Sequence, residues 1–375
     1  HQAAARVGGQ VSRRVEGLIL ALTAAATPLA GQALDRRVAG APDGNVQFHF
    51  AARPGVCGNG TTLLRVDDGG GYFYSSGNDM NRDQCAAGPV RVVVARIGKE
   101  IVKIETHAGP LTPEAGDGTN LGAVGSGEAS KWLLSLATSL EGRPARDALL
   151  PAMIADSSVV TPALAAIVRD TERSRDLRRS ALSWLSRRRD EAGGIGAAAT
   201  TRLLEEVVRN RSENESLRTS ALSSLSAMDR GEGVTTLIAF SRESDPWLAR
   251  QSFASLTRSG DPRARQFTRE AVRRAELTDE LRVLAIQGLG GDYATGADYR
   301  LLRELYPSLS SDRERDALIN ALGNAGGREN VSWLLSVAES QTEPVARRRR
   351  VISMLGRLDE PRIREALKGM AEKER

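Results

Sequence analysis

The C-terminal two-thirds of the chain is an internal repeat, and this feature constrains the fold more than any other. At the fourth, fifth and eighth residue after each repeat mark the side chain is almost always apolar, as in Ala181, Leu182 and Leu185. These offsets share one face of an α-helix, so each repeat predicts an amphipathic helix. The marks lie 31 to 33 residues apart, with one interval of 40, at Ala145, Leu177, Leu217, Leu248, Leu281, Glu314 and Arg347.

A second amphipathic segment follows most marks, as in residues 234–240, 299–306 and 331–338. Turn residues such as Gly326 and Gly327 separate the two segments, so each unit predicts a helical hairpin. The pattern predicts a mainly α fold over residues 127–375, a right-handed α-solenoid of about seven hairpins. The 40-residue interval contains a Gly/Ala-rich insertion at residues 191–201, which we expect to lengthen a turn.

One arginine recurs directly after the repeat mark in six of the seven units, and Ala249 is the exception. Acidic residues precede every mark by one to four positions, where they favour a helix start. A row of arginines predicts either a structural ladder, in which each bonds an acid or carbonyl of its neighbour, or a stripe for phosphates and acidic partners. The acids recur in step with the arginines, which favours a structural ladder made of Arg146, Arg178, Arg218, Arg282, Arg315 and Arg348.

The repeat units resemble the HEAT-repeat family, in particular its short phycobilisome-lyase-type repeats. The matching segments read DLRRSALSWLS, SLRTSALSSLS, ELRVLAIQGLG and RERDALINALG. The resemblance implies a protein-interaction scaffold, since most of the family has that role. A few relatives attach bilins or excise damaged DNA bases, and no residue here is distinctive of either activity.

Residues 36–110 predict a small β-rich module. Residues 46–50 alternate apolar and polar, which places His49 on the exposed side of a strand. Two β-branched runs, 92–97 and 101–106, flank a turn at Gly98 and predict a hairpin that His107 ends. Both histidines are conceivable general bases, but their strand positions explain them without catalysis. Residues 61–66 and 71–76 predict a further strand pair.

Cys57 and Cys85, the two cysteines of the chain, lie in Gly-rich loops of this module. In an exported protein such a pair predicts a structural disulfide. The alternative is a redox thiol pair, which usually has a short Cys-x-x-Cys spacing that is absent here.

Asp79, Asn81 and Asp83 have the alternate spacing with which calcium loops present oxygen ligands. Gln84 and Val90 stand where such a loop needs Gly and Glu, and Arg82 adds a positive charge. We therefore expect a solvated loop, and no metal site or cofactor.

Residues 1–35 predict a leader. Arg13 and Arg14 precede an uncharged run from Gly17 to Leu34, a layout typical of a signal peptide that is cleaved after Ala33. An uncleaved membrane anchor and a cytosolic helix are the alternatives. Residues 111–126 are rich in Gly, Thr and Pro, and predict a linker.

The charge balance gives little support to a nucleic-acid partner, since 52 basic residues oppose 47 acidic ones for a net charge of +5. Aromatic residues make up only 4%, which disfavours a binder that stacks single-stranded bases. No nucleophile elbow, phosphate-binding loop or metalloprotease motif is present in the sequence. The chain is therefore expected to be an exported, periplasmic or cell-envelope scaffold without enzymatic activity, with a protein partner on the concave face. The alternatives are a cytosolic nucleic-acid or base-excision-like protein and an accessory lyase or chaperone for a cofactor-bearing protein.

Overall fold

A computed structural model describes residues 32–66, 72–75, 85–111, 118–188, 191–228, 231–358 and 361–373. Residues 1–31 of the predicted leader lie outside this set, as do Asp79, Asn81 and Asp83. No helix within these ranges is long and apolar enough to span a membrane.

The N-terminal module contains two β-sheets whose strands are mostly antiparallel, which confirms its β-rich character. One sheet has the strand order β7-β6-β1-β8 and the other has the order β4-β3-β2-β5. Their bounds are β1 (Gly44–Phe50), β2 (Val56–Gly58), β3 (Leu63–Val66), β4 (Tyr72–Ser75), β5 (Ala86–Ala87), β6 (Val90–Ile97), β7 (Glu100–Ala108) and β8 (Thr119–Ala123).

The alternation in β1 works as the sequence predicts: Val46, Phe48 and Phe50 are buried, while His49 is half-buried on the opposite face. β6 and β7 form the expected hairpin, with Gly98 at positive φ in its turn. Cys57 and Cys85 are disulfide-bonded, so the predicted pairing is confirmed.

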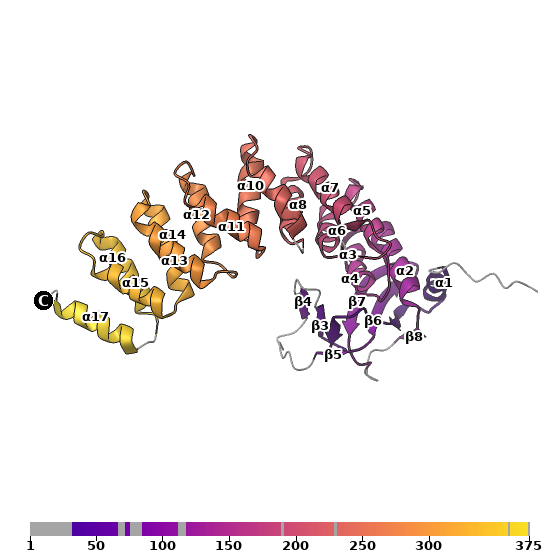
Figure 1. The fold of residues 1–375 in the computed structure, drawn as a ribbon. Coiled ribbons are helices and arrows are strands. Elements are labelled where there is room, and N and C mark those ends of the chain that lie inside the picture. Colours follow the sequence, from indigo (N-terminus) through magenta and orange to yellow (C-terminus); the bar gives the residue numbers. More distant parts are fainter. Residues whose placement is uncertain are drawn as a thin grey trace, which may run out of the picture.

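Helices make up the remainder of the described chain, as the repeat predicts (Figure 1). Each repeat mark lies at the start of a helix, and consecutive helices fold back on each other. The bounds are α1 (Gln32–Ala39), α2 (Ser126–Ser139), α3 (Gly142–Asp147), α4 (Leu149–Met153), α5 (Thr161–Arg169), α6 (Arg175–Arg187), α7 (Gly196–Arg209), α8 (Glu215–Ser226), α9 (Glu232–Phe240), α10 (Pro246–Thr257), α11 (Pro262–Ala271), α12 (Asp279–Leu289), α13 (Gly296–Leu305), the 3₁₀ turn η3 (Tyr306–Ser308), α14 (Asp312–Ala325), α15 (Arg328–Glu339), α16 (Val345–Leu355) and α17 (Pro361–Lys373).

The helical part is a HEAT-like solenoid. The even-numbered helices from α6 to α16 pack on one another in sequence order, and the odd-numbered helices form the second layer. Most of the apolar offsets read from the sequence are buried: Ala181, Leu182 and Leu185 each have 0% exposure, whereas Ile352 in the last unit is 36% exposed. Figure 1 shows the stack as an arc, with the strands beneath α3 and α4 at its N-terminal end.

One expectation about loops was wrong, and a second was correct only in part. Thr119–Ala123, in the predicted linker, forms strand β8, which pairs in parallel with β1. A strand forms here because the neighbouring β1 supplies backbone partners, although the segment itself has no apolar alternation. In the 40-residue interval, α7 begins at Gly196, so only the first half of the insertion is a turn.

The module and the first helices share a single hydrophobic core. The ring of Phe48 on β1 meets the edge of Trp132 on α2 with centroids 5.7 Å apart. Trp132 Nε1 in turn donates to Asp35 Oδ1 of α1 over 3.1 Å. A backbone bridge between Ala52 and Ala155 joins the module to the end of α4. Helix α1 is thus an integral part of the core, although the sequence placed its first half in the leader.

The helix of the first unit is interrupted between α3 and α4. Pro151 has no amide proton for the carbonyl of Asp147, four residues earlier, and its ring clashes with that carbonyl. α3 accordingly ends at Asp147 and α4 begins at Leu149. α3 packs against β7.

Candidate functional site

A cavity of about 440 Å³ lies where the β-module meets the first helices of the solenoid. We call it the junction pocket. Its walls come from β7, the turn before β3, and helices α3, α4 and α6. Leu149, Leu150 and Trp184 supply apolar surface. Sites where two structural units meet are common places for ligand binding.

β7 presents its outer edge to the junction pocket. Five consecutive residues, Lys103 to His107, line the cavity. Side chains alternate between the two faces of a strand, so a consecutive run can line one cavity only when the cavity follows the strand edge. β7 is the last strand on this side of its sheet within the described residues.

Charged groups surround the junction pocket unevenly. Lys103 Nζ lies 2.6 Å from Glu105 Oε1, and Arg143 Nε lies 3.2 Å from Asp147 Oδ2. Arg146 Nε lies 3.8 Å from Asp147 Oδ1, beyond hydrogen-bond range. Three cations therefore face two carboxylates, and Arg146 has the weakest of the three pairings.

His107 projects into the junction pocket, in contrast to the expectation that it merely ends a strand. Its Nδ1 is hydrogen-bonded to the carbonyl oxygen of Thr61. Burial lowers the pKa of His107, although the bond to Thr61 opposes this effect, so the surroundings favour the neutral ring. If Nδ1 carries the proton for that bond, Nε2 is an acceptor.

The ladder arginines of the following units have different partners. Arg178 donates from Nε to the carbonyl of Val168 over 2.9 Å, and pairs through both terminal nitrogens with Glu213 of the next unit. These hydrogen bonds lower the pKa of Glu213. Arg218 repeats the first contact with the carbonyl of Val208 over 2.8 Å. In both cases the carbonyl acceptor lies at the end of the preceding helix, where it lacks an intrahelical partner.

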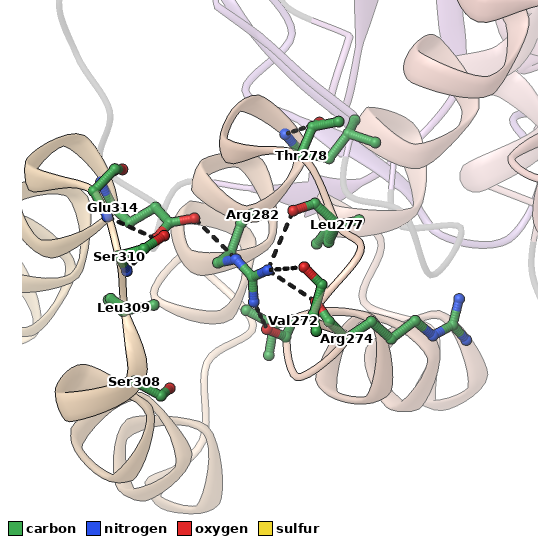
Figure 2. Close-up of polar contacts among 12 residues, drawn as sticks. Val272, Arg274, Leu277, Thr278, Arg282, Ser308, Leu309, Ser310 and Glu314 are labelled. Atoms are coloured by element: carbon green, nitrogen blue, oxygen red, sulfur yellow. Dashed lines mark hydrogen bonds and ion pairs between the residues drawn. The ribbon is translucent and has the colours of Figure 1, made fainter.

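Arg282 shows the same arrangement in full (Figure 2). It donates to the carbonyls of Val272 and Arg274, each over 2.8 Å, and to that of Leu277 over 3.2 Å. Its Nε lies 2.9 Å from Glu314 Oε1, a carboxylate of the next unit. Arg282 thus joins the end of α11, its own helix and the start of α14.

The remaining ladder positions vary. Arg315 donates to the carbonyl of Leu309 over 2.8 Å. Arg218 also lies over the ring of Trp247, with its guanidinium carbon 3.8 Å from the centroid. Arg348 occupies the corresponding position on α16. Arg146 departs from the pattern, because its side chain is 43% exposed and lines the junction pocket.

A buried ion cluster on α11 and α13 was not foreseen from the sequence. Asp298 is fully buried and accepts from Arg265 over 2.7 Å, from Arg269 over 2.6 Å, and from both the amide and the hydroxyl of Thr295 over 2.8 Å. Burial acts to raise the pKa of Asp298, but these hydrogen bonds hold it far below its usual value. The cluster joins two units and opens into no cavity among the described pockets.

A second hollow, of about 470 Å³, lies at the turns before α8 and α10. Its arginines are already paired, since Arg209 lies 2.7 Å from Glu243 and Arg211 lies 2.9 Å from Asp245. The junction pocket is therefore the stronger candidate site. No group of His, Cys, Asp and Glu within the described ranges is arranged to hold a metal ion.

No family model and no curated protein matches the chain. Among solved structures, human deoxyhypusine hydroxylase in complex with glycerol is similar at 17% identity and a TM-score of 0.27, over 65% of this chain and 90% of that one. The CpcE and CpcF complex of phycocyanin lyase from Nostoc sp. is similar at 17% identity and a TM-score of 0.29, over 55% and 79%. Legionella pneumophila aminopeptidase A in complex with aspartic acid is similar at 10% identity and a TM-score of 0.33, over 88% and 49%.

Proposed function

We propose that this chain is an exported, non-enzymatic scaffold for protein–protein interaction, located in the periplasm or cell envelope. The observation that carries the proposal is the stack of hairpins, in which the even-numbered helices from α6 to α16 pack on one another in sequence order and form an extended arc (Figure 1). Such a stack offers a long continuous surface for its size, and helical-repeat proteins use their concave surfaces for binding. We place the protein partner on the concave side of the arc.

The disulfide between Cys57 and Cys85 supports the export part of the proposal. Disulfides persist in oxidising compartments and are rare in the reducing cytosol. The fully buried Leu34 and the nearly buried Val38 fasten α1 to the core, and the proposed cleavage after Ala33 would leave both residues in the mature protein.

The ladder contacts weigh against the alternative in which the arginines form a stripe for nucleic acid. Arg178 and Arg282 are 8% and 13% exposed, and their guanidinium groups are bonded to carbonyls and carboxylates. A phosphate would have to displace these buried partners. We therefore propose that the ladder holds adjacent units together.

Crosslinking in intact cells, followed by mass spectrometry of the envelope fraction, tests the proposed function. The expected result is a mature N-terminus at Leu34, an oxidised Cys57–Cys85 pair, and reproducible crosslinks from the solenoid to one protein partner. A protein found in the cytosol with reduced cysteines would contradict export. Correct export without any protein crosslink to the solenoid would contradict the scaffold role.

A further inference from the structure

We propose that the junction pocket binds a carboxylate group carried on an apolar body, with Arg146 as its principal donor. This inference does not depend on the scaffold proposal, since it concerns a cavity of the N-terminal region and not the arc of the solenoid. Three observations support it: the state of Arg146, the charge of the pocket, and the apolar wall beside it.

Arg146 has a guanidinium that is available for a ligand, unlike those of Arg178 and Arg282. Arg178 and Arg282, at the same repeat position, each bind a helix-end carbonyl and a carboxylate of the next unit. The contact of Arg146 within the described residues is Asp147, 3.8 Å away. Arg146 lies on the short helix α3, which packs against β7, and its side chain lines the junction pocket. The planar guanidinium of Arg146 can therefore donate two parallel hydrogen bonds to one anion.

The charges around the pocket favour a singly charged anion. Lys103, Arg143 and Arg146 face Glu105 and Asp147, which leaves one positive charge without a counterpart. A carboxylate carries one negative charge and would balance this remaining positive charge. A phosphate dianion would bring an excess of negative charge against the same two carboxylates, so we infer that it binds more weakly.

The apolar part of the ligand has its own contact surface. Leu149, Leu150 and the ring of Trp184 form the wall on the helical side. The volume of about 440 Å³ falls in the range that small organic ligands occupy. A carboxylate on an aliphatic or aromatic body therefore matches both walls. The group reaches the protein as a free acid or as an acidic side chain beside an apolar residue of another protein.

Histidine NMR tests the proposal, because the chain has only three histidines and His107 lines the pocket. The probes are phenylacetate, a capped Leu-Glu-Leu peptide whose only charge is the Glu side chain, its Leu-Gln-Leu counterpart, and inorganic phosphate. We expect phenylacetate or the Glu peptide to shift the His107 ring signals and to raise its pKa, since a nearby anion favours the imidazolium. The Gln peptide should leave the signals unchanged.

Three variants give the test its controls. Arg146→Gln should weaken binding of the active probe at least about ten-fold, since a charge-assisted hydrogen bond is lost. Arg146→Lys keeps the charge but loses the planar guanidinium, so we expect an intermediate loss that guards against a folding artefact. Arg250→Gln removes an exposed arginine on α10, paired with Glu280 and outside the pocket lining, and should leave binding unchanged.

The possible outcomes distinguish a free acid from a protein segment as the ligand, and they include results that would contradict the proposal. Binding of phenylacetate alone identifies a free acid, whereas binding of the Glu peptide alone identifies a protein segment. Phosphate binding as tight as that of either carboxylate would overturn the inferred preference. No His107 response to any carboxylate at millimolar concentration, or equal affinity in the Arg146→Gln and Arg250→Gln variants, would overturn the site.

Discussion

Arg282 and Glu314 belong to successive units of the solenoid, yet their side chains meet at 2.9 Å and are 13% and 1% exposed. The same guanidinium donates to four carbonyls at the end of the preceding helix and in the loop after it (Figure 2). One side chain thus fixes the loop that connects the preceding hairpin to its own hairpin, and also the spacing to the next hairpin. This double role is what a repeat needs from a residue that recurs once per unit.

Replacing Arg282 with Gln should lower the free energy of unfolding by about 3 to 5 kcal/mol, because a buried carboxylate is left without its charged partner. Chemical unfolding followed by far-UV circular dichroism measures the change. Arg250→Gln is the matched control, since Arg250 also reaches the next unit but its pair with Glu280 is 47% exposed on both sides. We expect the control to cost less than about 1 kcal/mol. Similar losses in both variants would show that burial of the ladder pair contributes nothing.

Asp298 should make the stability of the protein sensitive to acid. Its pKa is lower in the folded state than in the unfolded chain, so its stabilising contribution is present above the usual aspartate pKa of about 4 and is lost as the pH falls below it. Asp298→Asn should therefore be strongly destabilised at pH 7, and the gap to the wild type should narrow toward pH 2. Urea unfolding of the variant and the wild type at pH 7 and pH 2 measures this difference in unfolding free energy. A gap independent of pH would contradict the assigned ionisation.

The control for this acid effect is Asp176→Asn. Asp176 pairs with Arg179 on the surface of α6, with both side chains 50% exposed. Its replacement should change the unfolding free energy by less than about 1 kcal/mol at either pH.

Replacing both Cys57 and Cys85 with Ser should destabilise the β-module. The bond closes a loop with a sequence separation of 28, which in the chain-entropy model is worth roughly 3 to 4 kcal/mol. Limited proteolysis should first cut the sheet of β2 to β5, while the far end of the solenoid resists. Wild-type protein with a reductant should behave like the variant. Equal protease resistance with and without the bond would refute a structural role.

Gly288 should tolerate no side chain, because it marks a close contact between α12 and α10. A Cβ there would lie 2.4 Å from the carbonyl oxygen of Thr257. Gly288→Ala should cost about 1 to 3 kcal/mol through overpacking. Gly369→Ala, in α17 where an added Cβ has no atom within 4 Å apart from the adjoining helix backbone, should instead stabilise by up to about 1 kcal/mol. Thermal unfolding of both variants separates packing from helix propensity.

The solenoid was predictable because its signal is repeated. A single apolar triad such as Ala181, Leu182 and Leu185 is weak, but its recurrence in every unit specifies both the helix and its buried face. Strand β8 lacked such a signal. Thr119–Ala123 contains one large apolar residue, Leu121, and becomes a strand through pairing with β1 far away in the sequence.

The site was predictable only in part, since spacing gives the position of a side chain but not its partners. Asp298 and Arg265 are 33 residues apart and resemble ordinary surface residues in sequence, so their buried contact was invisible. Arg146 looked like any ladder arginine, and its place in the junction pocket follows from the packing of α3 against β7, which the repeat spacing does not reveal. His107 was correctly placed near the end of a strand, but its cavity depends on helices that arrive later in the chain.

The common core of Phe48 and Trp132 has an evolutionary consequence. A recombination event with its crossover between β7 and α2 would separate the segment that carries Phe48 from the segment that carries Trp132. Both aromatic rings would then be exposed, and β8 would remain with only one of the two segments. Shuffling of this N-terminal module among genes must therefore carry the first hairpin along with it. Duplication of whole units further down the arc has no such restriction, so length variation among descendants should accumulate there.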